Sequence, residues 1–390
     1  MSPRSPRKLA AALVNTWAPT DGARDGAAWV AADAPRRALS QALAARGHAI
    51  TVIQESTFDE RYWDGAVRWE LHPSGGVARC ARDALRAMGD PHPMVRAPTP
   101  VAALRAATGR FNVVHSFDVA FPLSLAGLAL AAGLRGAALV AHLHGGQPAR
   151  RWPLAAVHRA ALGRVRAVCV TDPARAGDWA PAPVVSVLET STTMRPVPRD
   201  AARAALAARL RLDPAAAWVV HLGRLDAVKD PLTSVRAFAR LPGRPHLLMA
   251  YTDAPLHDAV EAELRASGAA SRARLLGRVD PTGVAELLSA SDAFVQASVR
   301  EVCGVSTLEA AACGALPALS DLPVFARTLG GHGARFAVGD ADGAAEAIVS
   351  VLRAPAGARE ALRAHFAENL SFDALAREIE AVWGSVVERR

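Results

Sequence analysis

The sequence predicts an α/β fold with two domains, each built on a parallel sheet that is covered by helices. The length of 390 residues exceeds one ordinary core and suits two domains of roughly 180 residues. The composition is 51% hydrophobic but only 5% aromatic, which favours alanine-rich helices packed on sheets over an aromatic-rich β-sandwich. Short Val, Ile and Leu runs alternate with helical segments, as in parallel sheets with crossover helices.

In the first half of the chain, short apolar runs mark the strands of one sheet. The first strand is followed by a glycine-bearing loop with Gly22 and Gly26, and then by a long helix that we expect to end at Arg46, before Gly47. A loop in this position is where doubly wound folds contact ligands, and a structural turn is an equal alternative because no G-x-G-x-x-G is present. The predicted strands are Leu9–Val14, Ala49–Ile53, Val113–His115, Ala138–Ala141, Ala167–Val170 and Val184–Leu188.

The periodicity breaks after Glu189, where two prolines and a polar cluster indicate a linker. The predicted boundaries are a first domain over 1–190, a linker over 191–200 and a second domain over 201–370. The strands of the second sheet are predicted at Trp218–Leu222, His246–Ala250, Arg274–Leu276, Ala293–Gln296, Ala315–Leu319 and Arg335–Val338. Two such domains leave a ligand cleft at the carboxyl ends of both sheets.

Within the first domain, residues 1–8 are predicted to be a disordered lead, and Pro91–Pro100 a surface loop. The four cysteines form no CxxC pair and have no histidines at zinc spacing, so neither a disulfide framework nor a structural metal is expected. No apolar run is long enough to span a membrane, and we expect a cytoplasmic protein.

The formal charge of +8 allows nucleic acid, anionic lipid or a phosphorylated small molecule as partners. The basic residues are scattered, and much of the charge is expected to be solvated surface. In Arg150–Arg166, basic residues alternate with apolar ones at roughly helical spacing. This segment is interpreted first as a surface helix packed on the sheet, and second as a peripheral contact with an anionic membrane.

The segment Glu301–Ser320 reads as loop, helix and strand, and it carries two carboxylates eight positions apart. The turn at Gly304 is expected to expose backbone N–H groups at a helix start, where the helix dipole favours phosphate. Glu309 lies further along the helix and is suited to accept hydrogen bonds from sugar hydroxyls. The exposed N–H groups are expected at Val305, Ser306 and Thr307.

Arg224 and Lys229 follow the first strand of the second domain, in the loop and at the start of the next helix. An arginine fork and a compact ammonium a few residues apart are suited to hold a diphosphate. Lys229 is one of two lysines in the chain, the other being Lys8, which suggests that a slim point charge is needed there. The alternative is a solvated pair of loop residues.

These motifs resemble the retaining GT-B glycosyltransferases of the family-4 type, the glycosyl transferases group 1. The similarity rests on Arg224 and Lys229 in GRLDAVKD, on LLGRV at Leu275–Val279, and on Glu301 and Glu309 in E-x7-E. Further motifs in the same order are RGHAITV, VVHSFD, AHLHGG and the closing SFDALAREIEAVW. The resemblance implies two Rossmann-like doubly wound domains facing across a cleft, with a C-terminal helix over 371–390 returning to the first domain.

The resemblance further implies a hexosyltransferase that moves a sugar from a nucleotide diphosphate sugar to a small or lipid-linked acceptor, with retention and without a metal or other cofactor. UDP is favoured over GDP and ADP. Arg224 and Lys229 would hold the diphosphate together with Gly304, Val305, Ser306 and Thr307, Glu309 the ribose, and Arg278 and Val279 the base. Glu301 and His144 would act on the transferred sugar from the second and first domain, while Gly22 and Gly26 would line the first-domain loop.

Several positions depart from the family pattern. The adjacent glycines of the first loop are absent, and Glu189-Thr-Ser-Thr-Thr and Tyr251-Thr-Asp-Ala replace two expected runs. Cys303 stands where the family has phenylalanine, and Asp321-Leu-Pro replaces a glycine pair. These changes lie around the implied sugar and acceptor pocket, so they leave the acceptor open, and they also permit an inactive relative.

Two other functions remain as alternatives. A sugar-nucleotide epimerase or hydrolase on the same scaffold would turn over the donor without an acceptor. A basic protein that binds nucleic acid or a membrane surface would need clustered cations with stacking aromatics, for which the sequence offers only Arg150–Arg166. No nucleic-acid partner is therefore expected.

Overall fold

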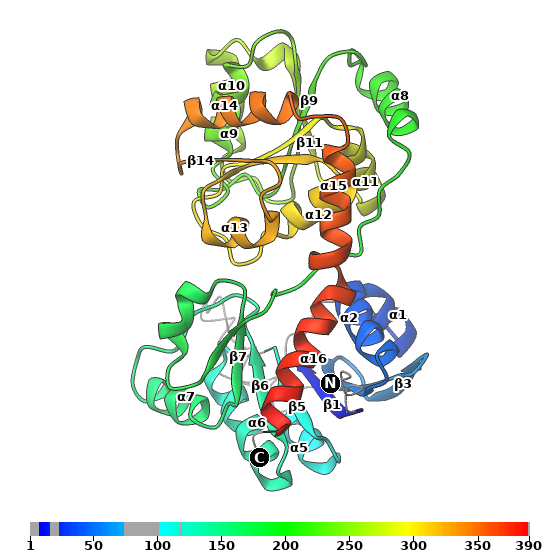
Figure 1. Ribbon diagram of the computed structural model, residues 1–390, viewed down its shortest axis with the longest axis vertical. Coiled ribbons are helices and arrows are strands. Elements are labelled where there is room, and N and C mark those ends of the chain that lie inside the picture. Colours follow the sequence, from blue (N-terminus) through cyan, green and yellow to red (C-terminus); the bar gives the residue numbers. More distant parts are fainter. Residues whose placement is uncertain (1–7, 16–22, 74–100, 118, 389–390) are drawn as a thin grey trace, which may run out of the picture. The chain divides into compact units, whose positions relative to one another are not determined.

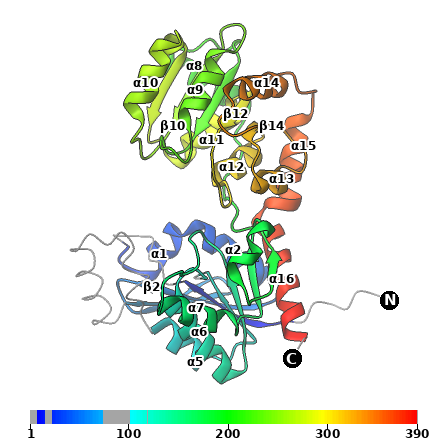
Figure 2. The same ribbon diagram turned by 90° about the vertical axis from the view of Figure 1, so that its left-hand side faces the viewer.

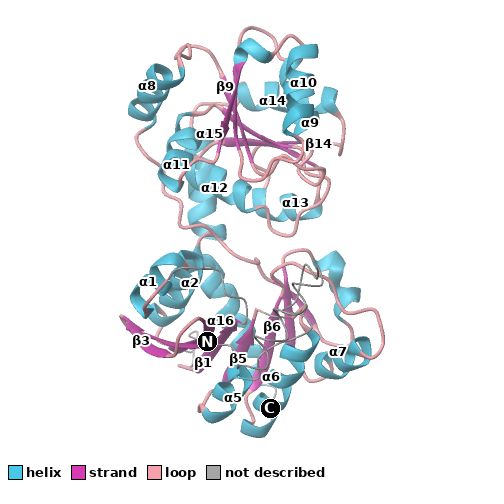
Figure 3. Cartoon of the chain, turned by 180° about the vertical axis from the view of Figure 1, so that it is seen from behind, coloured by secondary structure: helices cyan, strands magenta, loops and turns pink. Residues whose placement is uncertain are grey.

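The computed structural model describes residues 8–15, 23–73, 101–117 and 119–388. Two compact units form the chain: residues 1–190 together with 372–390, called unit 1, and residues 191–371, called unit 2 (Figure 1). In each unit, helices cover a central sheet, which confirms the predicted α/β class (Figure 3). Gly22, residues 1–7 of the predicted lead and the predicted loop Pro91–Pro100 lie outside the described residues.

The sheet of unit 1 has the order β3-β4-β2-β1-β5-β6-β7-β8. All neighbouring strands are parallel except β3, which pairs antiparallel with β4 at the edge. Chain order reverses at β1, the doubly wound pattern in which ligands bind beyond the carboxyl ends of the central strands. The strands are β1 (Ala10–Asn15), β2 (Ala49–Ser56), β3 (Glu60–Asp64), β4 (Val67–Pro73), β5 (Val113–Ser116), β6 (Ala138–His142), β7 (Ala167–Val170) and β8 (Val184–Ser186).

The helices of unit 1 include the C-terminal one, which packs on α2 and contacts β6 as expected. Trp383 on this helix is fully buried and donates from Nε1 to Nδ1 of His115 at 3.1 Å. Glu380 accepts hydrogen bonds from Arg46 and lies 2.9 Å from His48 Nε2, which fixes the helix against the start of β2. The helices are α1 (Gly26–Ala32), α2 (Ala34–Ala45), α5 (Val101–Thr108), α6 (Pro122–Arg135), α7 (Leu154–Leu162), the 3-10 turn η1 (Pro173–Trp179) and α16 (Phe372–Glu388).

Two features of unit 1 differ from the sequence prediction. The single long helix before Gly47 is wrong, because Asp33 ends α1 and caps α2, with a proline in the first turn of α2. Proline is tolerated there but breaks a continuing helix. The hairpin β3–β4 was not predicted, because β3 (ERYWD) is a polar edge strand whose outer side chains are exposed.

The sheet of unit 2 is parallel throughout and has the order β11-β10-β9-β12-β13-β14. Its strands coincide with the predicted ones to within two residues at each end. They are β9 (Trp218–Leu222), β10 (His246–Ala250), β11 (Ala273–Gly277), β12 (Ala293–Gln296), β13 (Leu316–Ser320) and β14 (Ala334–Phe336).

Helices cover both faces of this sheet, and a separate apolar cluster lies under each layer. Val219, Val295 and Ile348 belong to one cluster, and Val220, Phe294 and Phe325 to the other, as expected when successive strand residues point to opposite faces. The helices are α8 (Arg199–Leu210), α9 (Pro231–Ala239), α10 (His257–Ala266), η2 (Ala270–Arg272), α11 (Pro281–Ala290), α12 (Val305–Cys313), α13 (Pro323–Leu329), α14 (Ala341–Leu352), α15 (Ala358–His365) and the π-turn η3 (Phe366–Leu370).

Candidate active site

Two loops of unit 2 meet at the point where the strand order reverses. Strand β9 pairs with both β10 and β12, so chain order runs outward from it in both directions. The loops after β9 and β12 therefore lie at the same carboxyl edge, where open α/β sheets bind their ligands. Arg224 and Lys229 are in the first loop, and Glu301 is in the second.

The loop after β9 is held by its own polar side chains. Asp226 accepts from the N–H groups of Val228 and Lys229 at 3.0 and 2.9 Å, which forms a tight turn. Asp230 then caps α9 by accepting from the N–H of Thr233 at 3.2 Å. Leu225 is fully buried and anchors the loop in the core of unit 2. The loop is therefore fixed at both ends before any ligand binds.

Lys229 projects from this loop toward the second one. Its aliphatic stem passes Gly223, where an added Cβ would lie 3.7 Å from Cδ and Cε of the lysine. Its ammonium donates to Oε1 of Glu301, and the two side chains are only 17% and 10% exposed. The structure thus brings the predicted cation and carboxylate into direct contact within one unit.

Glu301 is held by a network that the sequence analysis did not identify. Its Oε1 also accepts from Gln296 Nε2 at 2.6 Å and from Ser298 Oγ at 2.8 Å. Gln296 is fully buried at the end of β12, and its Oε1 accepts from Ser306 and Thr307 at 2.9 and 3.1 Å. One buried amide therefore couples the carboxylate to the first turn of α12. A glutamine ending an apolar strand, AFVQ, is the signal that could have indicated it.

Gly304 begins helix α12 in a conformation that requires glycine. Its φ is +74°, and an added Cβ would lie 2.7 Å from Cε1 of the buried Phe325. The N–H of Thr307 donates to the carbonyl of Gly304 at 2.9 Å, so the expectation of a free N–H is wrong at Thr307. Among the described residues, the N–H groups of Val305 and Ser306 have no acceptor, and they remain at the positive end of the helix.

Glu309 lies in the second turn of α12 and makes no hydrogen bond or ion pair with the residues that the structure describes. Burial raises the pKa of its carboxyl from 4.5 to about 7. A partly buried carboxyl without a donor is expensive to ionise, and a ligand that supplies hydroxyl donors would offset that cost. Glu309 is therefore suited to accept hydrogen bonds from a ligand.

The other predicted residues of unit 2 lie further from this contact. Arg224 is half-exposed and pairs with Asp226 at 3.0 Å. Arg278 is exposed and Val279 half-buried in the loop after β11, an edge strand separated from β9 by β10. Arg224, Arg278 and Val279 lie at the same carboxyl edge as Lys229. Among the described residues, none of the three contacts Glu301.

In unit 1, His144 follows β6 and belongs to a cluster of aromatic rings. Its ring centroid lies 4.8 Å from that of Phe117 and 5.1 Å from that of His142. His142 Nδ1 lies 3.3 Å from His115 Nε2, and burial lowers the pKa of His142 to about 4. Trp383 donates a hydrogen bond to Nδ1 of His115, so a neutral His115 carries its proton on Nε2. This N–H then donates a hydrogen bond to Nδ1 of His142.

Gly26, the described member of the predicted first-loop pair, makes close structural contacts. Its N–H donates to Glu60 at 2.7 Å, and an added Cβ would lie 2.7 Å from Cβ of Tyr62. The residue lets α1 begin directly against β3. This packing explains the glycine without a ligand.

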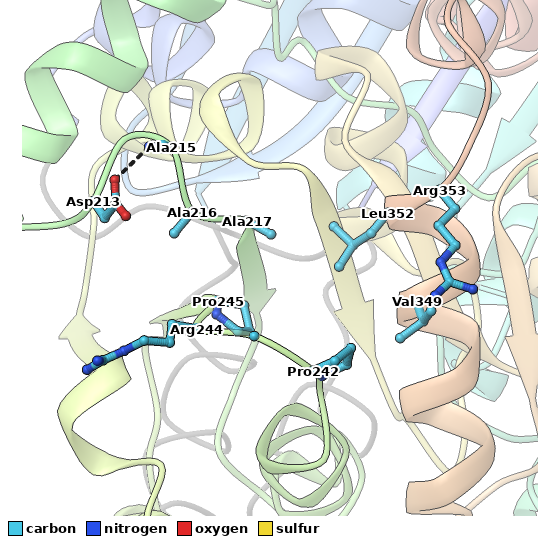
Figure 4. Close-up of a pocket in the computed structure, with 11 residues that line it drawn as sticks. Asp213, Ala215, Ala216, Ala217, Pro242, Arg244, Pro245, Val349, Leu352 and Arg353 are labelled. Carbon is cyan, nitrogen blue, oxygen red and sulfur yellow. Dashed lines mark hydrogen bonds between the residues drawn. The ribbon is translucent and has the colours of Figure 1, made fainter.

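A cavity of about 400 Å³ opens elsewhere in unit 2 (Figure 4). Ala215, Ala216 and Ala217 line it just before β9, and Pro242 and Pro245 just before β10. It therefore lies at the amino ends of these strands, opposite the edge with Lys229 and Glu301. Among the described residues, no cluster of three or more His, Cys, Asp or Glu side chains is placed to hold a metal ion.

Part of unit 2 is similar to a known protein family. Residues 216–354 match the family model described as glycosyl transferases group 1. A D-inositol 3-phosphate glycosyltransferase of Mycolicibacterium paratuberculosis is 34% identical over 174 residues, which is 43% of this chain and 38% of the relative. One from Mycobacterium avium is also 34% identical over 174 residues, 43% of this chain and 40% of the relative. The chain thus matches well under half the length of these curated relatives.

Solved structures resemble the whole fold. Sucrose-phosphate synthase from Thermosynechococcus elongatus superposes with a TM-score of 0.69 at 20% identity, over 98% of this chain and 100% of that one. HepE of Anabaena, solved in complex with UDP-glucose, gives a TM-score of 0.65 at 15% identity, over 97% and 100% of the two chains. These similarities establish the GT-B fold.

Proposed function

We propose that this chain, whose residues 216–354 carry a glycosyl transferases group 1 domain in a GT-B fold, transfers a sugar from a nucleotide diphosphate sugar to an acceptor. The observation that carries the proposal is the group of polar residues at the switch point of unit 2. At one edge of the sheet it combines a cation (Lys229), a carboxylate (Glu301), and two N–H groups and a carboxyl (Glu309) that have no partner among the described residues. The diphosphate, the sugar and the ribose of a nucleotide sugar are complementary to these groups.

In the proposed donor complex, the diphosphate lies at the start of α12 and draws the ammonium of Lys229 toward itself, with Arg224 as a second cation. The N–H groups of Val305 and Ser306 bind phosphate oxygens at the positive end of the helix. Glu309 accepts from the ribose hydroxyls, and Arg278 and Val279 border the base. UDP is the favoured nucleotide, in keeping with the complexes described for HepE.

The proposed chemistry follows from where charge develops. As the glycosidic bond breaks, the sugar ring becomes positive and the leaving phosphate oxygen negative. Glu301 is placed to stabilise the first charge and Lys229 the second, so the two side chains separate when the donor enters between them. His144 acts on the sugar from unit 1. The acceptor oxygen forms the new bond on the retained face, and its proton passes to the leaving phosphate.

Transfer with retention and without a metal is part of the proposal, because Lys229, Arg224 and the helix start supply the positive charge that the diphosphate requires. The acceptor is a small molecule or a lipid-linked one. An epimerase or hydrolase on this scaffold would instead consume the donor at full rate in the absence of acceptor. That difference is measurable as the dependence of donor consumption on added acceptor.

Calorimetric titration of the full chain with UDP, GDP, ADP and their glucose adducts tests the proposal. We expect UDP and UDP-glucose to bind with a Kd between about 1 μM and 1 mM, the usual range for enzyme substrates. Glu309→Ala is expected to weaken binding at least about tenfold, because a charge-assisted acceptor for the ribose is lost. If none of the nucleotides binds, or if Glu309→Ala binds as the wild type does, the donor site is wrongly assigned.

The raised pKa of Glu309 predicts that the affinity for UDP-glucose depends on pH. Only the ionised carboxylate accepts from both ribose hydroxyls, and a group with a pKa of about 7 is mostly protonated at pH 6. The affinity for UDP-glucose should therefore rise about tenfold between pH 6 and pH 8 and then level off. Titrations in Glu309→Gln provide the control, since the amide does not ionise. A rise of the same size in that variant would assign the titration to another group.

A further inference from the structure

The formal charge of the chain is concentrated in one stretch of unit 1. Residues 101–170 contain eight arginines, no lysine and a single acidic residue, Asp118. Their formal charge is +7, against +8 for all 390 residues. The rest of the chain is therefore close to neutral, and the scattered appearance of the arginines in the sequence conceals a strongly basic segment.

The helices of this segment form one layer on the sheet of unit 1. Helix α6 packs against both α5 and α7, and Figure 2 shows the three together, apart from α1, α2 and α16. Seven of its arginines are exposed, and none of the seven forms an ion pair with a described residue. They are Arg110, Arg135, Arg150, Arg151, Arg159, Arg164 and Arg166. Their charge is therefore not compensated within the described part of the chain.

Three of these arginines occupy the same edge of the sheet. Arg110 lies between α5 and β5, Arg135 ends α6 before β6, and Arg164 lies between α7 and β7. Strands β5, β6 and β7 are parallel neighbours, so their amino ends lie side by side. The three cations thus form a row at the amino edge of the sheet in unit 1.

Large apolar side chains are exposed beside this row. Leu104 on α5 is 61% exposed, and Leu130 and Leu134 on α6 are 62% and 82% exposed. Leu130 and Leu134 share a helix face with Gly127, whose added Cβ would lie 3.3 Å from Ala103 of α5. The leucines therefore follow the seam between α5 and α6. Arg135 donates across that seam to the carbonyl of Ala107.

A cavity of about 640 Å³ continues the basic surface on the other side of α5. It is lined by four arginines from three elements and a loop, Arg61, Arg68, Arg105 and Arg110, with Ala10 and Ala49 marking the amino ends of β1 and β2. Within it, Glu70 pairs with Arg68 at 2.5 Å and with Arg105 at 3.6 Å, which leaves Arg61 and Arg110 without an acidic partner among the described residues. An anionic group is the complementary occupant.

We propose that this surface, the basic face (Arg110, Arg135 and Arg164 with Leu104, Leu130 and Leu134), docks unit 1 onto an anionic lipid bilayer. Cations attract the negative headgroups, and the exposed leucines enter the boundary between headgroups and acyl chains. A lipid phosphate fits the arginine-lined cavity. Exposed leucines favour a bilayer over nucleic acid, because stacking on bases requires aromatic side chains and the seam carries none.

No helix in the described ranges has the length and apolar character needed to cross a membrane, so the proposed attachment is peripheral. Of the segment Arg150–Arg166, only Arg164 belongs to the basic face, because the 84% exposed Trp152 precedes α7, at the opposite end of that helix. The inference stands apart from the proposed sugar transfer, since binding to a bilayer requires neither donor nor acceptor.

The test is co-sedimentation of the full chain with vesicles of phosphatidylcholine alone or with 30% phosphatidylglycerol, at low and at 0.5 M salt. We expect binding to the anionic vesicles only, and loss of it at high salt. The variant Arg110→Glu/Arg135→Glu/Arg164→Glu should bind at least about 100-fold more weakly, from a roughly fivefold effect per arginine. Leu104→Ser/Leu130→Ser/Leu134→Ser should bind at least about tenfold more weakly.

The matched control is Arg244→Glu/Arg265→Glu/Arg353→Glu, which makes the same change in net charge at exposed positions of unit 2. It should bind anionic vesicles within about threefold of the wild type. Equal loss in the control, or wild-type binding in both basic-face variants, would overturn the proposal, as would tighter binding to duplex DNA than to vesicles at the same salt. Thermal unfolding and UDP titration of each variant separate these outcomes from misfolding and from failure of the donor site.

Discussion

Lys229→Met is expected to lower the rate of UDP release from the bound donor by about 100-fold to 1,000-fold. The methionine keeps an unbranched stem of similar length beside Gly223, so the loop after β9 should retain its shape. What is lost is the ammonium, which in the proposed reaction neutralises charge that grows as the phosphate leaves. Because that charge is larger in the transition state than in the donor, kcat should fall much more than donor affinity.

The measurement is steady-state UDP release together with calorimetric affinity for UDP-glucose, both on the full chain. Arg353→Met serves as control, because that arginine lines the cavity at the amino edge of unit 2, away from Lys229. The control should release UDP at the wild-type rate. A variant of Lys229 with unchanged kcat and weakened donor binding would mean that the lysine holds the donor without assisting the departure of the phosphate.

Glu301→Gln is expected to reduce UDP release by about 100-fold to 1,000-fold while leaving the affinity for UDP within about threefold. Glutamine occupies the same volume, and its carbonyl oxygen still accepts from Gln296 and Ser298, so the network at the end of β12 should persist. Only the negative charge is removed. In the proposed reaction that charge faces the sugar, which UDP lacks.

Comparing the rate of UDP release with the affinity for UDP distinguishes a role of Glu301 in the reaction from a structural role. If Glu301 only oriented Lys229, the variant would bind UDP differently and its kcat would follow that of Lys229→Met. Glu346→Gln is the matched control, since Glu346 lines a different cavity with Gly331 and Ser350. Wild-type kcat in Glu301→Gln would remove the carboxylate from the chemistry.

The sequence was most informative where local pattern decides structure. In unit 2 the buried strands are short, apolar and bounded by polar loops, so their positions follow from composition, and the loops after β9 and β12 could be recognised as site loops. The contact between Lys229 and Glu301 joins residues far apart in the sequence. Spacing alone suggested a common edge, and the strand order of the sheet is what brings the two side chains together.

The unpredicted features depend on tertiary contacts. Gln296 and Ser298 carry no motif, and their role as partners of Glu301 arises from the turn between β12 and α12. The N–H of Thr307 donates to the carbonyl of Gly304 within the first turn of α12. Sequence spacing alone could not have predicted that hydrogen bond. The edge strand β3 has a polar outer face and lacks the apolar pattern that identified the other strands. The net charge of the whole chain does not show that residues 101–170 carry most of it.

A crystal structure of the full chain with UDP bound tests the central claim most directly. The account predicts the diphosphate at the carboxyl edge of the sheet in unit 2, within hydrogen-bond distance of Lys229 Nζ and the N–H of Ser306, and the ribose hydroxyls on Glu309. Lys229 should no longer contact Glu301. UDP bound at the amino edge, in the cavity between Ala216 and Pro245, or UDP that leaves the ion pair of Lys229 and Glu301 intact, would contradict it.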